Sequence, residues 1–191
     1  MYTTLLADAT LFDALLAIDH DLATTAQAGG CLICGRRLHH ADYPRKPRGG
    51  PATLGPGYDR RTSFCCAACR TRLTPASVRF LGRKVYLGVV VLLACVLRQG
   101  PTPWRVARLR EQLGVGADTL ARWHHWWRDA FVRTPFWKSA RAHFARPSAE
   151  GELPVSLLQQ FAGNGFVQVV AALRFLRPLT TTSAVTLGEG C

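Results

Sequence analysis

Two cysteine pairs in this sequence have the spacing of metal ligands. Cys31 and Cys34 are separated by two residues, as are Cys66 and Cys69, and 31 residues lie between the pairs. A two-residue gap lets a tight turn point both sulfurs at one ion, and a tetrahedral zinc site takes four such ligands. The sequence therefore predicts one structural zinc ion bound by these four cysteines.

The second pair leaves the identity of one ligand open. Cys65 precedes Cys66 and would replace it through a Cys-x3-Cys spacing, although two adjacent residues rarely bind one ion. His39 and His40 are alternative ligands. Reduced thiols without metal and a redox Cys-x2-Cys motif are the competing interpretations. No glutamate lies within the cysteine region to act as a base, so we expect a closed structural site rather than a catalytic one.

The charge distribution indicates a polyanionic partner. The 191 residues include 24 Lys and Arg against 12 Asp and Glu, a net charge of +12. Residues 1–30 hold four acids and no Lys or Arg, whereas residues 36–84 hold twelve basic residues and two acids. Residues 98–146 hold ten basic residues and three acids. One sign dominates about half the chain, which favours a nucleic-acid-binding surface over a merely solubilising one.

Basic side chains around the cysteine pairs are the candidate phosphate contacts. They are Arg45, Lys46, Arg48, Arg60, Arg61, Arg70 and Arg72. Contacts to phosphate supply affinity without reading base sequence, so sequence readout has to come from another element.

The run "TPWRVARLREQLGVGADTLARWHHWW" predicts two helices around a glycine-containing turn. Thr102 followed by Pro103 is typical of a helix start, and Gly114 of a helix end. On the second helix, Arg122 and His125 lie opposite the apolar face and are the candidate base contacts, with Arg122 suited to guanine. With the apolar run 85–97 as a preceding helix, we expect a three-helix helix-turn-helix unit. An ordinary αα-hairpin is the alternative.

The fold class that we predict is mostly α with a small zinc-ribbon module of short strands. The apolar periodicity and the glycine and proline content divide the chain into four segments. These are an N-terminal helical segment over 1–30, a zinc ribbon with a long basic loop over 31–80, a helix-turn-helix domain over 83–146, and a C-terminal helical segment with a disordered tail over 147–191.

Two motifs together resemble a known family. "CLICG", an Arg-rich loop and "RRTSFCCAACRTRLTPASVRF" are similar to the zinc ribbons that open many bacterial insertion-sequence transposases, and "VARLREQLGVGADTLARW" resembles their helix-turn-helix. The resemblance covers about residues 31–130 and implies DNA binding and association with a mobile element. Those transposases continue into an RNase-H-like domain with three carboxylates. Here only Glu150, Glu152 and Glu189 follow residue 146, so the catalytic activity is not carried over.

We therefore expect a non-enzymatic, zinc-dependent DNA-binding protein. The alternatives are a transcriptional regulator or accessory subunit that docks a protein partner, or a second copy, through its N- and C-terminal helices, and an RNA-binding zinc protein. The longest apolar run, 13 residues, is shorter than the roughly 20 needed to span a bilayer. The N-terminus lacks the basic region of a signal peptide. We expect no membrane association and a bacterial cytoplasmic, nucleoid-associated location.

Overall fold

The computed structural model describes residues 2–51, 54–81, 86–96, 107, 110–111 and 113–181. The α-helices are α1 (Tyr2–Leu5), α2 (Ala9–Ala28), α3 (Gly88–Val96), α5 (Ala117–His125), α6 (Pro135–Ala140), α7 (Val155–Leu158) and α8 (Gly165–Leu176). The strands are β1 (Leu38–His40), β2 (Tyr43–Pro44), β3 (Arg60–Arg61), β4 (Phe64–Cys66) and β5 (Arg72–Leu73). The predicted class, mostly α with a small β module, is confirmed at this level.

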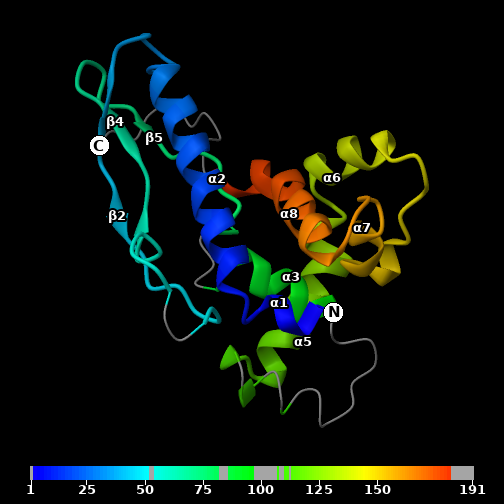
Figure 1. Ribbon diagram of the computed structural model, residues 1–191. Helices are drawn as coiled ribbons and strands as arrows, with labels where there is room; N and C mark the ends of the chain where they lie inside the picture. Colours follow the sequence, from blue (N-terminus) through cyan, green and yellow to red (C-terminus); the bar gives the residue numbers. More distant parts are fainter. Residues whose placement is uncertain are drawn as a thin grey trace.

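The longest helix in the described part of the chain, α2, lies between the strands and the other helices (Figure 1). Asp8 caps its N-terminus by accepting a hydrogen bond from the Thr10 backbone amide at 3.0 Å. Near the start of α2, Phe12 and Leu15 pack into the main core of the helical part. Near its end, Ala23 packs against the strands in a second, smaller cluster. That cluster consists of Ala23, Cys31, Leu38, Phe64 and Cys66.

The strands form two small antiparallel sheets. β1, β4 and β5 pair in the order β1–β4–β5, with Leu38 opposite Cys66 and Cys65 opposite Arg72. β2 and β3 pair with Tyr43 opposite Arg61. Because side chains alternate across a strand, one face of the larger sheet is buried against α2 and the other faces outward.

A buried ion pair joins α2 to the segment that follows the sheets. The Arg79 Nε donates to the Asp19 carboxylate at 2.7 Å, and both side chains are at most 3 % exposed. The Ser77 hydroxyl and the Val78 amide also donate to this carboxylate, at 2.5 and 2.7 Å. The second arm of the guanidinium donates to the Gly57 carbonyl at 2.8 Å. This network fixes the strand module to the helical part.

The helical core is built around α3, all nine residues of which are buried. This confirms the helix predicted for the apolar run. The buried side chains Leu120, Trp123, Trp127 and Phe131 line the inner face of α5 and its continuation, as the spacing predicts. That continuation is one turn of π-helix (Trp126–Phe131), which the sequence pattern does not indicate. The described residues also form short 3-10 helices at Arg141–His143, Glu150–Glu152 and Arg177–Thr180.

Some predictions fall on residues that the structure leaves undescribed. Most of the first helix of the expected helix-turn-helix, 102–113, lies outside the described residues, so that motif remains a prediction. The tail from residue 182 onward lies outside them as well. Within the described part of the chain, no helix has both the length and the apolar character needed to cross a membrane.

Candidate metal centre

The first knuckle is a tight turn that directly follows α2. The Cys31 amide donates to the Arg36 carbonyl at 2.8 Å, and the Gly35 amide donates back to the Cys31 carbonyl at 2.8 Å. Gly35 has a positive φ of 67°, a conformation that glycine adopts without steric cost. These constraints hold Cys31 and Cys34 on the same side of the turn.

The second knuckle, between β4 and β5, repeats this backbone pattern. The Cys66 amide donates to the Thr71 carbonyl at 3.0 Å, and the Arg70 amide donates to the Cys66 carbonyl at 2.9 Å. Arg70 stands where the first knuckle has Gly35, and its φ is also positive, at 59°. The two knuckles therefore present their cysteines with the same local geometry.

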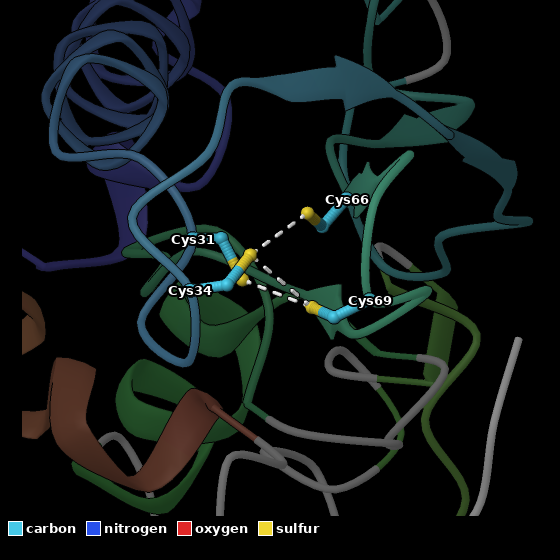
Figure 2. A group of neighbouring side chains, drawn as sticks. All are labelled: Cys31, Cys34, Cys66 and Cys69. Carbon is cyan, nitrogen blue, oxygen red and sulfur yellow. Dashed lines mark hydrogen bonds between the residues drawn. The ribbon is translucent and has the colours of Figure 1, made fainter.

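The four sulfurs of Cys31, Cys34, Cys66 and Cys69 converge on one point (Figure 2). All of them lie within 4.8 Å of one another. The Sγ atoms of Cys31 and Cys69 are 3.4 Å apart, those of Cys34 and Cys66 3.5 Å, and those of Cys34 and Cys69 3.6 Å. These separations exceed a disulfide bond of about 2 Å, and the cysteines are free thiols.

The spacing of the sulfurs fits a single tetrahedral ion. Four thiolates bound at about 2.3 Å around such an ion would lie about 3.8 Å from one another. The observed separations approach this value, and four thiolates so close together would need a cation to offset their repulsion. Four protein ligands would complete the tetrahedral coordination of such an ion, which is typical of a structural site.

The alternation of side chains along β4 places Cys66, rather than Cys65, in the sulfur cluster. Cys66 is fully buried on the inner face of β4, with its sulfur in the cluster. Cys65 lies on the opposite face, where its sulfur is 3.7 Å from the Arg70 carbonyl. His39, across the sheet from Cys65, and His40, whose ring packs at 5.0 Å from that of Phe64, are both outside the cluster.

Hydrogen bonds shift the thiol pKa values of Cys34, Cys66 and Cys69 in different directions. The Thr71 hydroxyl, 3.2 Å from the Cys69 sulfur, is the main cause that lowers the pKa of Cys69 to about 6. The backbone amide of Cys69 lowers the pKa of Cys66. At Cys34 the Arg36 amide, the largest single cause, favours the thiolate, but the sulfurs of the other three cysteines and burial together raise the pKa to about 12. Without a cation, the cluster therefore retains protons on part of its sulfurs.

Most of the predicted phosphate contacts have exposed side chains. These are Lys46, Arg48, Arg60, Arg70 and Arg72. Arg72 also donates to the Ala41 carbonyl at 2.8 Å and lies over the Tyr43 ring at 5.7 Å. Arg45 is half-buried, with its guanidinium 5.4 Å from the centre of the Phe80 ring.

Arg61 is a correction to the predicted set. Its residue is only 4 % exposed, its guanidinium donates to the Pro75 carbonyl, and it lies 5.9 Å from the Phe80 ring centre. Burial lowers its pKa. In β3 the side chain of Arg60 faces outward, so the neighbouring Arg61 must face inward. Arg61 is therefore a packing residue rather than a phosphate contact in this structure.

Arg122 and His125, the predicted base contacts, are both exposed on α5. The Arg122 Nη2 donates to the Thr119 hydroxyl at 3.1 Å, one turn earlier on the helix. His125 lies 3.7 Å from the Asp129 carboxylate, which also pairs with Arg133 at 2.5 Å. Both side chains are accessible, but an acidic group shares their face.

Several residues that matter to this site escape the sequence patterns. Arg36 and Arg37 follow the first knuckle and are exposed, and their position beside a metal knuckle is the signal that would have added them to the basic set. The contact between Thr71 and Cys69 depends on the turn geometry. No family model, curated protein or solved structure matches this chain.

Proposed function

We propose that the cysteine cluster binds one zinc ion and that the module it stabilises binds duplex DNA. Zinc is favoured because four thiolates in a closed tetrahedral arrangement suit this soft, redox-inert ion. The cluster is the single observation that carries the proposal. It cross-links the end of α2 to the β4–β5 turn, and the small apolar cluster around it offers little other stabilisation.

The exposed basic side chains of this module favour a polyanionic partner. In the described part of residues 31–81 they are Arg36, Arg37, Lys46, Arg48, Arg60, Arg70 and Arg72. Asp59 is the exposed acid of the same described stretch, and Asp42 is half-buried with its carboxylate accepting from the Ser63 amide at 3.1 Å. Such an excess of cations gives affinity for nucleic acid through phosphate neutralisation.

Exposed side chains on α5 would add sequence preference. The Arg122 guanidinium matches the two acceptors that guanine presents in the major groove. His125 lies one turn further along the same helix. Association with a mobile element is a further part of the proposal, and it rests on the sequence resemblance alone.

Binding to labelled duplex DNA by fluorescence anisotropy, across a range of salt concentrations, tests this function. We expect the zinc-loaded protein to bind with an affinity that falls linearly on a log–log salt plot. Lys46→Ala should weaken binding to all sequences alike and lower the salt slope by about one. Lys138→Ala, which changes an exposed lysine of α6, is the matched control and should leave the slope unchanged.

The same titration distinguishes the other partners. Absence of duplex binding at low salt would contradict the proposal. Tighter binding to folded RNA than to duplex DNA would replace DNA by RNA as the partner. Arg122→Ala should relax selectivity at one base-pair position, and unchanged selectivity would remove that residue from base recognition.

A further inference from the structure

The tip of the first knuckle exposes two large apolar side chains. Leu32 is 75 % exposed and Ile33 is 58 % exposed, the highest values for large hydrophobic residues in the described part of the chain. They are the two residues between the ligands Cys31 and Cys34. In the free protein, side chains so exposed contribute little burial to stability.

Metal binding does not require bulky residues at this position. The second knuckle has the same backbone hydrogen bonds and carries Ala67 and Ala68 between its two ligands. The ligand geometry therefore does not need the leucine and the isoleucine, and their exposure indicates contact with another molecule.

The turn that carries them is closed by backbone hydrogen bonds and has exposed arginines nearby. Its ends are tied by the backbone bonds of Cys31 to Arg36 and Gly35, at 2.8 Å each. Arg36 and Arg37 follow it and are exposed, and the sulfur of Cys31 lies 3.4 Å from that of Cys69, the residue before Arg70. No acidic residue occurs in the sequence between Asp21 and Asp42.

We propose that Leu32 and Ile33 form an apolar wedge that enters the minor groove of bound DNA and partly unstacks a base step. This inference rests on the DNA binding proposed above and adds the mode of contact. Leucine and isoleucine are among the side chains that wedge between base steps in minor-groove complexes. The flanking arginines match the phosphates and the negative potential of the groove.

The size of the apolar tip favours DNA over a protein groove. A stable protein interface buries about 800 Å² on each partner, far more than two side chains on one turn supply. A wedge needs only such a pair, because phosphate contacts hold the DNA in place while the apolar side chains enter the stack.

Unstacking and bending of the DNA test the wedge. The probe is a duplex that carries 2-aminopurine at flexible TA steps and a donor–acceptor dye pair at its ends. We expect zinc-loaded wild-type protein to raise the 2-aminopurine emission and to bend the duplex by about 20–90°. The double variant Leu32→Ala with Ile33→Ala should keep one zinc and the wild-type salt slope but lose both signals.

The control variant is Val167→Ala, which changes an exposed apolar residue of α8 and should keep both signals. Wild-type binding without emission change or bending would overturn the wedge while leaving DNA binding intact. If the double variant raises the emission and bends the duplex as much as the wild type does, the wedge is overturned as well, and the tip would then fit a protein groove instead. Loss of zinc in the double variant would show that Leu32 and Ile33 have a structural role and would overturn the wedge. Failure of the wild type to bind DNA would overturn the proposed function together with the wedge.

Discussion

Gly35 and Arg70 occupy equivalent positions in the two Cys-x2-Cys knuckles, and both adopt left-handed backbone, with φ of 67° and 59°. Glycine tolerates this conformation, whereas a residue with a Cβ is disfavoured there by about 1–2 kcal/mol. The second knuckle thus keeps an exposed arginine at a position that disfavours it. The proposed role of Arg70 as a phosphate contact gives a reason for the exception.

Arg70→Gly should therefore move stability and binding in opposite directions. We expect the free energy of unfolding of the zinc-loaded protein to rise by up to about 1 kcal/mol, since backbone strain is relieved and glycine's extra chain entropy offsets part of the gain. DNA affinity should fall because one cation is lost. Arg70→Ala is the control, since it removes the charge and keeps the strain. Urea titration and anisotropy measure the two effects. Unaltered DNA affinity in both variants would refute the phosphate contact.

Arg60 and Arg61 are adjacent, but their substitutions should differ in kind. Arg61→Ala leaves the Pro75 carbonyl without its buried donor and should lower the free energy of unfolding by about 1–3 kcal/mol. Arg60→Ala, at an exposed position, should change stability by less than about 0.5 kcal/mol and lower the salt slope of DNA binding by about one. Urea titrations and salt-dependent anisotropy of both variants check this. A lower salt slope with Arg61→Ala, together with an unchanged slope with Arg60→Ala, would show that Arg61 leaves its buried position to bind phosphate.

The buried pair of Asp19 and Arg79 gives a third prediction. Asp19→Asn keeps the shape of the side chain but leaves the Arg79 guanidinium without its counter-charge. The free energy of unfolding should therefore fall by about 3–5 kcal/mol. Asp21→Asn, at an exposed position on the same helix, is the matched control and should change stability by less than about 0.5 kcal/mol. A similar, small effect of both substitutions in urea unfolding would contradict the structural role of the pair.

Sequence reasoning found what depends on local spacing. The two Cys-x2-Cys pairs lie together in the structure, the apolar run around residues 85–97 forms the buried α3, and the N-terminal segment expected to be helical contains α2. In each of these, residues close in the chain suffice to define the turn or the helical face.

What it left open or missed depends on which way a strand faces or on contacts between distant segments. The spacing to Cys69 allows either Cys65 or Cys66 as a ligand, but the two side chains lie on opposite faces of β4. The same alternation in β3 buries Arg61 and exposes the neighbouring Arg60. A strand of two or three residues shows no periodicity from which its inner face can be predicted. The pair of Asp19 and Arg79 spans 60 residues, and no local pattern marks it.

Removal of zinc should affect the two parts of the molecule differently. All five tryptophans lie between residues 104 and 137, outside the cysteine-containing stretch of the sequence, so their fluorescence does not come from the strand module. After chelation we expect backbone amide exchange to accelerate in residues 31–40 and 63–73, because the apolar cluster there is small. The tryptophan emission should stay at its zinc-loaded value. A simultaneous shift of that emission would show that the metal stabilises the whole chain instead.

The most direct measurement for the metal centre is the zinc content of the purified wild-type, Cys66→Ser and Cys65→Ser proteins by native mass spectrometry. We predict one zinc per chain in the wild type, loss of that zinc with Cys66→Ser and retention with Cys65→Ser, because only Cys66 has its sulfur in the cluster. A folded wild-type protein without zinc, or equal retention by both variants, would contradict the four-cysteine zinc site on which the proposed function depends.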